Sequence, residues 1–268
     1  MTQELTQNRI TDLFAQKSER LLSIYFTAGF PNLNDTLSIL RSLQAAGVDF
    51  VEIGMPYSDP VADGEIIQQS NGKALENGMS LKTLFAQLEG FREERSSDPV
   101  RMPVLLMGYI NPVLQFGVEN FCRKCQEVGV DGVIIPDLPL DLYLSDYAAT
   151  FREYGIINVN LITPQTSESR IRKIDEESDG FIYMVSSASI TGSTKGVSDS
   201  MRDYFERIQA MNLRNPHLIG FGIKDHQTFD TASQYSNGAF IGTAFIRHLT
   251  ENGTSAESIR EFVQSIRA

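Results

Sequence analysis

Two carboxylates close together in the chain are the residues best suited to acid–base chemistry. Glu52 lies within the apolar segment VDFVEIGM, and Asp63 follows in the run MPYSDPVADG. Apolar neighbours penalise the charged form of a carboxyl group, so we expect a raised pKa for Glu52, as suits a group that gives and accepts protons. Two other interpretations stay open: Glu52 as a buried glutamate paired with a base, and Asp63 as a turn or N-cap residue of the next helix.

Metal and thiol chemistry are not expected. Cys122 and Cys125 have a CxxC spacing, but they lie in a helical stretch without a second cysteine pair or clustered histidines, which favours two reduced thiols. His217 precedes a predicted strand at the bottom of the fold, and His226 and His248 lie in helical regions. No HxxxH or HExxH motif is present, so we expect no metal site.

The carboxylates need a scaffold, and the chain predicts one of alternating strands and helices. Short β-rich apolar runs recur with amphipathic segments between them, the pattern of βα units around a parallel sheet. The predicted strands are Leu22–Ala28, Phe50–Gly54, Val104–Tyr109, Gly132–Asp137, Asn158–Thr163, Phe181–Ser186, Leu218–Gly222 and Gly238–Gly242. The first helix has the helical period at Leu33, Leu37, Leu40 and Leu43 and stops at Gly47.

The length of 268 residues fits the roughly 250 residues of one α/β barrel. We therefore expect a (β/α)₈ TIM barrel as a single domain over residues 1–268, with an extra N-terminal helix at Ile10–Ser18 covering the bottom and a last outer helix at Ser255–Ile266. Active-site loops are expected at residues 55–78 and 186–200. The second, SSASITGSTKGVSDS, is too polar to pack and predicts a mobile lid, with an idle surface loop as the alternative.

Composition excludes several kinds of partner and location. The net charge of -11 repels nucleic acid and anionic lipid. No run of 18 apolar residues exists, and the polar N-terminus lacks the apolar region of a signal peptide. We expect a soluble, cytoplasmic protein.

Glycines near the ends of the last strands predict a phosphate site. Barrels often bind phosphate at the loops after strands seven and eight, where backbone N–H groups and a helix N-terminus meet the anion. The candidates are Thr191, Gly192, Phe221, Gly222, Gly242 and Thr243. A tight strand-to-helix turn also favours glycine, so the position in the barrel order carries this prediction. Residues that could line a flat apolar pocket near the strand ends are Tyr25, Tyr109, Ile162, Tyr183 and Phe221.

The run EIGMPYSDPVADG at residues 52–64 resembles the signature of tryptophan synthase alpha subunits, E-[IL]-G-x-P-[FY]-S-D-P-x-A-D-G. The resemblance extends over essentially the whole chain. Further matching segments are Thr27–Pro31, Leu106–Tyr109 with Asn111 and Pro112, Asp131–Val133 with Pro136–Pro139, and Gly220–Ile223.

The resemblance implies a lyase of tryptophan biosynthesis that splits indole-3-glycerol phosphate into indole and glyceraldehyde 3-phosphate by a retro-aldol step. Asp63 would polarise the indole N–H, and Glu52 would exchange protons at C3 and at the glycerol hydroxyl. The phosphate positions would be Gly192, Gly222, Gly242 and Thr243, and the indole positions Tyr25, Tyr109, Ile162, Tyr183 and Phe221. Thr191 matches the lid threonine that meets the catalytic aspartate.

The same resemblance implies a partner. This would be the beta subunit, which carries pyridoxal phosphate and receives indole. An alpha2-beta2 heterotetramer is expected, with no cofactor in this chain. Pro56 and Asp59 are the predicted interface residues. The chain departs from the family pattern at Glu65, where proline is usual, at Thr243, where serine is usual, and at Ser187 and Ser189 in the lid.

Three other functions compete with this one. Two carboxylates at a strand-end cleft also suit a glycosidase, but the chain has no tryptophan to form a sugar platform. A second alternative is another barrel enzyme of phosphosugar metabolism. A third is a catalytically silent subunit that only activates a partner, which the retention of both Glu52 and Asp63 disfavours.

Overall fold

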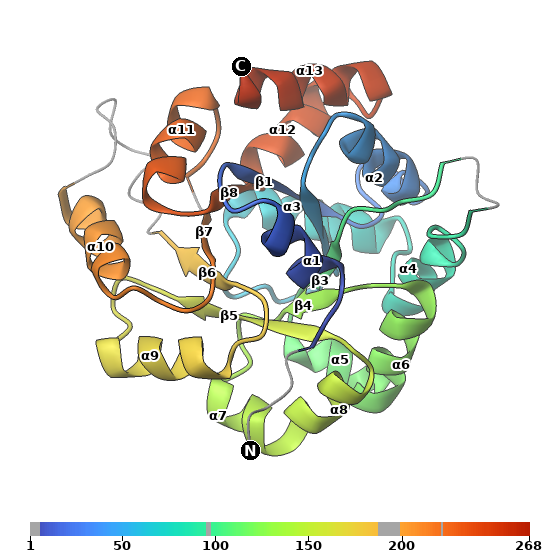
Figure 1. Cartoon of the computed structure of the whole chain (residues 1–268). Coiled ribbons are helices and arrows are strands. Elements are labelled where there is room, and N and C mark those ends of the chain that lie inside the picture. The colour runs from blue at the N-terminus through green and yellow to red at the C-terminus, as the bar shows by residue number, and fades with distance from the viewer. Residues whose placement is uncertain (1–5, 95–97, 187–198, 221) are drawn as a thin grey trace.

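Eight parallel strands close into a barrel in sequence order, as predicted (Figure 1). The computed structural model describes residues 6–94, 98–186, 199–220 and 222–268. The strands are β1 Leu21–Thr27, β2 Phe50–Gly54, β3 Val104–Met107, β4 Gly132–Ile134, β5 Ile157–Ile162, β6 Ile182–Val185, β7 His217–Gly220 and β8 Gly238–Ile241. β4 ends ahead of the predicted Asp137 because Pro136 has no N–H to donate to a ladder.

Helices form the outer layer around the strands (Figure 1). They are α1 Arg9–Gln16, α2 Thr36–Ala45, α3 Glu65–Glu76, α4 Leu81–Leu88, α5 Ile110–Phe116, α6 Val118–Val128, α7 Leu140–Leu142, the π-helix η1 Tyr143–Tyr147, α8 Ala148–Glu153, α9 Glu168–Glu177, α10 Asp199–Ala210, α11 His226–Tyr235, α12 Thr243–Asn252 and α13 Ala256–Arg267. None of the described helices is long and apolar enough to cross a membrane.

Two predicted loops need correction or qualification. The segment 55–78 is not a loop throughout, because α3 occupies Glu65–Glu76 once the two prolines of the signature have passed. Of the predicted lid 186–200, residues 187–198 lie outside the described part of the chain, and α10 already begins at Asp199.

The barrel lumen is filled by large side chains at its lower end. Phe50, Phe181 and Phe240 meet there, with ring centroids 5.6 Å apart for Phe50 and Phe181 and 5.8 Å apart for Phe50 and Phe240. Ile10 of α1 is buried in the same cluster, and Phe14 packs on Phe181. The predicted N-terminal helix therefore closes the bottom of the barrel, and any site must lie at the other end.

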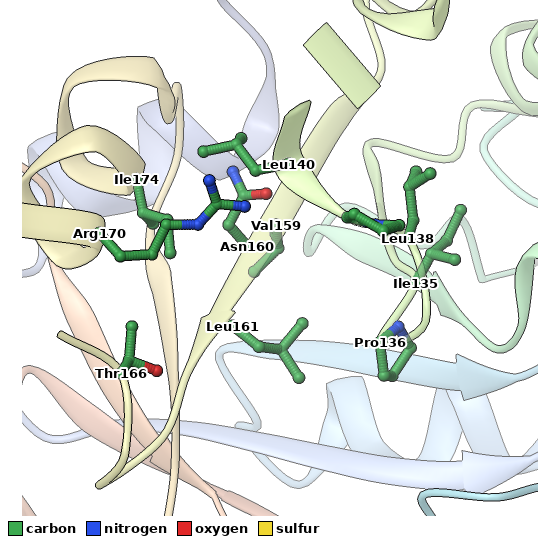
Figure 2. A pocket seen from close by; sticks show the side chains of 11 residues that line it. Ile135, Pro136, Leu138, Leu140, Val159, Asn160, Leu161, Thr166, Arg170 and Ile174 are labelled. Atoms are coloured by element: carbon green, nitrogen blue, oxygen red, sulfur yellow. The ribbon is translucent and has the colours of Figure 1, made fainter. Parts of the chain in front are cut away.

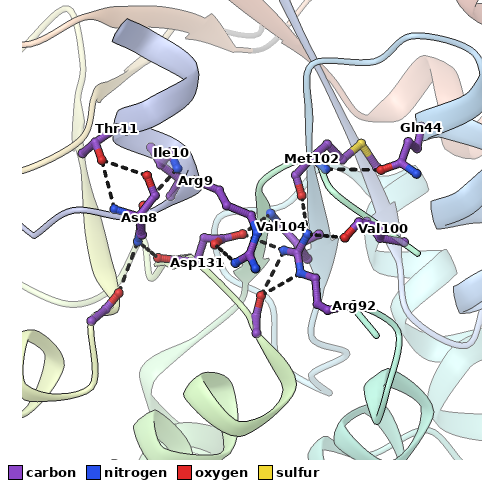
Figure 3. Close-up of polar contacts among 12 residues, drawn as sticks. Asn8, Arg9, Ile10, Thr11, Gln44, Arg92, Val100, Met102, Val104 and Asp131 are labelled. Carbon is purple, nitrogen blue, oxygen red and sulfur yellow. Dashed lines mark hydrogen bonds and ion pairs between the residues drawn. The ribbon is translucent and has the colours of Figure 1, made fainter. Parts of the chain in front are cut away.

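Asp131, just before β4, joins the N-terminal helix to the barrel bottom (Figure 3). Its carboxylate accepts hydrogen bonds from Arg9 at 2.9 Å, from Arg92 at 2.7 Å and from the backbone N–H of Val104 at 2.8 Å. Its backbone carbonyl accepts from the amide of Asn8, which is also the N-cap of α1. Arg92 donates in addition to the carbonyls of Val100, Met102 and Gly129.

This cluster should contribute measurably to stability. The Asp131 side chain is 2% exposed and that of Arg92 is 11% exposed, so each group depends on the other to offset the loss of hydration. Asp131→Asn keeps the shape of the side chain but leaves the buried guanidinium of Arg92 without its counter-charge. We expect the free energy of unfolding to fall by about 3 kcal/mol, measured by urea unfolding followed by circular dichroism.

Asp230→Asn is the matched control, because Asp230 pairs with Arg20 and both side chains are largely exposed. This variant should leave the urea midpoint almost unchanged. Equal losses in the two variants would contradict a special contribution from Asp131.

Candidate active site

Glu52 lies inside the barrel on β2, with its side chain fully buried. The hydroxyl of Ser23 on β1 donates to Oε1 at 2.8 Å, and Oε2 has no hydrogen-bond partner among the described residues. Among the described residues, no lysine, arginine or histidine contributes to its pKa shift, so none of them supplies the base of the alternative in which Glu52 is paired. Burial raises the pKa of Glu52 to about 8, and the Ser23 hydrogen bond opposes this shift.

Asp63 is half-buried in the segment that follows β2. The hydroxyl of Tyr109 donates to its Oδ2 at 3.1 Å, and the same hydroxyl accepts the N–H of Ala62 at 2.9 Å. Burial raises the pKa of Asp63, and the Tyr109 hydrogen bond opposes this. The N-cap of α3 is Gly64, without a side-chain capping bond, so Asp63 is not the cap of this helix.

Two buried tyrosines place both carboxylates in one region. The pKa of Tyr25 on β1 and that of Tyr183 on β6 are raised first by burial and further by the charges of Asp63 and Glu52. Tyr183 stacks on Phe240 with ring centroids 4.1 Å apart, so the ring that lies near the carboxylates also packs on the apolar cluster of the lower lumen. Three of the predicted pocket residues, Tyr25, Tyr109 and Tyr183, are therefore brought together around Glu52 and Asp63.

Glycines make room for these rings. A Cβ atom on Gly54 would lie 2.2 Å from the Tyr25 hydroxyl, and one on Gly220 would lie 2.2 Å from the Tyr183 hydroxyl. Both distances are far below van der Waals contact, so neither position accepts a larger residue without moving a tyrosine. Gly54 and Gly220 thus shape the site although they offer no chemistry.

The structure brings the described part of the predicted phosphate site to adjacent strand ends. Gly222 follows β7 with φ 78°, a conformation that glycine adopts without strain. Gly242 is the N-cap of α12 and has no side-chain cap, and Thr243 is the first residue of that helix. β7 and β8 are neighbours, so the two turns face the same end of the barrel. The other predicted residues, Thr191, Gly192 and Phe221, lie outside the described residues.

Ile162 is placed differently from the other predicted pocket residues. Ile157, Val159 and Leu161 of β5 belong to the lumen cluster or pack against it, and Ile162 has the opposite parity along this strand. Side chains alternate along a strand, so Leu161 is the β5 residue that the sequence reasoning missed on the lumen side. Ser23, which donates to Glu52, was missed as well; its signal is a small polar residue among the apolar residues at the start of the run LLSIYFT.

A cavity of about 200 Å³ lies beside β5, beyond the end of β4 (Figure 2). It is lined by Ile135, Pro136, Leu138, Pro139, Leu140, Val159, Asn160, Leu161, Thr166, Arg170 and Ile174. It contains neither carboxylate and none of the predicted site residues. We therefore define the candidate site by the hydrogen bonds and burial of Glu52 and Asp63, and not by this cavity.

The thiols and acidic groups of the described residues do not gather into a metal site. No group of three histidine, cysteine, aspartate or glutamate side chains that could hold an ion occurs in the part of the chain that the structure describes. Cys122 and Cys125 lie buried and unlinked in α6, and burial raises the pKa of Cys122 to about 12. The thiols are therefore protonated at neutral pH and chemically quiet.

Fold and site together define a (β/α)₈ barrel that holds a fully buried carboxyl group with a raised pKa inside its lumen. A family model described as tryptophan synthase alpha chain matches residues 12–267. The tryptophan synthase alpha chain of Flavobacterium psychrophilum is 56% identical over 259 residues, which cover 97% of this chain and 99% of the relative. That of Bacteroides thetaiotaomicron is 48% identical, with 97% and 100% covered.

Solved structures agree with these relatives. A chain of the tryptophan synthase complex from Pyrococcus furiosus superposes with a TM-score of 0.80 at 32% identity, covering 93% of this chain and 98% of that one. The tryptophan synthase alpha chain from Legionella pneumophila gives 0.84 at 27% identity, covering 97% and 96%. The chain belongs to the tryptophan synthase alpha chain family. It is a lyase that cleaves indole-3-glycerol phosphate in tryptophan biosynthesis.

The raised pKa of Glu52 makes stability depend on pH in a defined direction. Because the folded-state pKa of about 8 exceeds the usual 4.5, the folded protein binds the proton more tightly than the unfolded chain does. Stability is therefore highest below the unfolded pKa and falls as pH rises through the folded pKa. Glu52→Gln removes this titration, so the variant should gain about 1.4 kcal/mol per pH unit relative to wild type across that window.

Urea unfolding of wild type and Glu52→Gln at pH 5 and at pH 9 measures this difference. Groups that titrate equally in both proteins cancel in the comparison. A stability difference that stays constant between the two pH values would mean that Glu52 has an ordinary pKa.

Proposed function

We propose that Glu52 and Asp63 carry the acid–base chemistry of this lyase. The supporting observation is the full burial of Glu52, with no charged partner and no hydrogen bond to Oε2 from any residue that the structure describes. A group with a pKa of about 8 is largely protonated at neutral pH and can give a proton to C3 of the indole ring. The glycerol hydroxyl next to C3 then loses its proton, the carbon–carbon bond breaks, and indole and an aldehyde form.

Asp63 has the complementary role in this proposal. Protonation at C3 leaves positive charge on the indole nitrogen, and a carboxylate held in place beside that N–H stabilises it. The Tyr109 hydroxyl fixes one oxygen of Asp63 and favours its charged form. The environments of the two carboxyl groups thus differ in the way that an acid and an electrostatic stabiliser require.

We assign the substrate phosphate to Gly222, Gly242 and Thr243, together with Gly192, and Thr191 to the contact with the catalytic aspartate. The uncapped N-terminus of α12 supports this, because its backbone N–H groups and its dipole favour an anion and no side chain competes for them. The indole ring is assigned to the space between Tyr25, Tyr109 and Tyr183, with Leu161 in place of the predicted Ile162 on the lumen side of β5 and Phe221 as a further predicted contact.

Glu52→Gln and Asp63→Asn should both slow the reaction severely. Glutamine cannot transfer a proton, so turnover should fall by roughly 10²–10⁴-fold. Asparagine at position 63 offers no negative charge to the indole N–H, so we expect a loss of roughly 10²–10³-fold, comparable with the loss of a well-placed electrostatic group. Indole release from indole-3-glycerol phosphate measures both effects, with circular dichroism confirming the fold.

Asp141→Asn is the control, because Asp141 is an exposed carboxylate paired with Arg170 and Lys173 on the outer surface. It should keep wild-type turnover. Turnover of Glu52→Gln within a few-fold of wild type would show that Glu52 is structural and would revive the silent-subunit alternative.

We further propose that this chain works with a beta subunit in an alpha2-beta2 heterotetramer. The solved Pyrococcus furiosus structure is a tryptophan synthase complex. Pyridoxal phosphate belongs to the partner in this proposal, and a cytoplasmic location follows the same expectation.

The exposed apolar side chains support a docking face on this chain. The large exposed ones are Val61, Leu114 and Leu142, at 84%, 46% and 41% exposure. They lie in the segments that follow β2, β3 and β4, which begin at the same end of the barrel. Pro56 and the exposed Asp59 lie in the first of these segments. Large apolar groups left in water at one rim are typical of a surface that a partner covers.

The partner should stimulate the lyase, because the segment that bears Val61 and Asp59 runs between Glu52 and Asp63. Fixing this segment fixes the relative position of the two carboxylates. Coupling free energies of about 1–3 kcal/mol correspond to roughly 5–150-fold, so we expect stimulation in that range. Asp59→Ala should lose most of the stimulation and keep its basal rate.

The measurement is indole release as beta subunit is added, for wild type, Asp59→Ala and the control Glu257→Ala on α13. The control removes an exposed carboxylate from the outer helix layer and should respond like wild type. A flat titration of wild type would reject activation by the partner. Equal stimulation of all three proteins would show that Asp59 does not transmit the effect of the beta subunit.

A further inference from the structure

Ser23 places a fully buried hydroxyl group in the largely apolar strand β1. Its exposed fraction is 0%, in the middle of β1. The backbone of this strand is held by parallel pairing, in which Ser23 lies opposite Phe50 of β2 and Phe240 of β8. The hydroxyl adds nothing to that pairing. A buried hydroxyl needs a partner, and the one it has is Oε1 of Glu52, at 2.8 Å.

This contact makes the two oxygens of the Glu52 carboxyl group different. Oε1 accepts the hydrogen bond from Ser23, whereas Oε2 is buried without a partner among the described residues. A hydrogen bond to a charged group is short and directional, so it restricts rotation of the carboxyl group as well as stabilising the charge. The free oxygen is then presented in one orientation.

We propose that Ser23 is a positioning residue for the lyase reaction: it holds Oε1 of Glu52 and leaves Oε2 as the oxygen that exchanges the proton. The proposal rests on the proposed catalytic role of Glu52. In the step it describes, the proton on Oε2 moves to C3 of the substrate and the resulting carboxylate keeps its hydrogen bond from Ser23. The carboxylate then accepts the proton of the glycerol hydroxyl, again on Oε2, so the protons balance.

The hydrogen bond between Ser23 and Glu52 can be detected through the pH at which Glu52 titrates. The titratable groups that interact with it are Tyr25 on β1, Tyr183 on β6 and, through these tyrosines, Asp63 after β2. Burial raises the pKa of both tyrosines above their usual value, so they stay neutral in the range where Glu52 titrates. Ser23 donates to the charged form of Glu52 and so lowers its pKa. Removing the hydroxyl must therefore move the Glu52 titration to higher pH.

Ser23→Ala, Ser23→Thr and wild type should be compared for kcat and KM across pH. We expect Ser23→Ala to lower kcat about tenfold at pH 7 with KM nearly unchanged, and to shift the Glu52 limb of the kcat profile upward by about one pH unit. Threonine keeps the hydroxyl and should restore the wild-type limb. Ser178→Ala removes another buried serine hydroxyl, which accepts from Asn160, and should leave the pH profile unchanged.

A readout that does not need turnover separates this proposal from the role of Glu52 itself. The infrared band of the protonated Glu52 carboxyl is isolated by subtracting the spectrum of Glu52→Gln, in the wild-type and in the Ser23→Ala background, over the same pH range. The band should titrate at higher pH without Ser23. An unmoved band, or a kcat that falls equally at every pH, would overturn the positioning role. Retained turnover in Glu52→Gln would instead overturn the catalytic assignment, and the band would still report the contact.

Discussion

The burial of one carboxyl group that has no charged partner among the described residues is the constraint on which the candidate site depends. Ion pairs and hydrogen bonds normally compensate a buried charge, and Glu52 has a single neutral hydroxyl. The barrel supplies the apolar surroundings through the phenylalanine cluster below and the tyrosines beside it. Those tyrosines fit only because Gly54 and Gly220 lack side chains. Burying this carboxyl group therefore costs folding free energy at the site, which the packing of the large core offsets.

Polar groups are arranged differently at the two ends of the barrel. At the bottom, the Asp131 carboxylate pairs with two arginines and accepts a backbone N–H, and so ties α1 to the strands. At the other end, Oε2 of Glu52 is unbonded and the N-terminus of α12 is uncapped. Polar groups that would be paired in a purely structural region are left available at the end where we propose that the substrate binds.

The departures from the family signature fit the same physical roles as the usual residues. Glu65 replaces proline at the first position of α3. Proline suits this position because it needs no N–H there, and glutamate suits it because its charge complements the helix dipole. Thr243 replaces serine at the first position of α12 and keeps both the backbone N–H and the hydroxyl. These changes conserve what each helix start provides.

The sequence by itself determined the barrel and its eight strands, because strand alternation and turn residues are local properties, and the run at residues 52–64 was enough to single out Glu52 and Asp63 as candidates. It could not decide whether Asp63 caps a helix, that Leu161 and not Ile162 packs against the lumen cluster, or that Ser23 is the partner of Glu52. Each of these depends on the register between strands and on which face of a strand looks inward. Closure of the barrel fixes both by packing residues that are far apart in the chain.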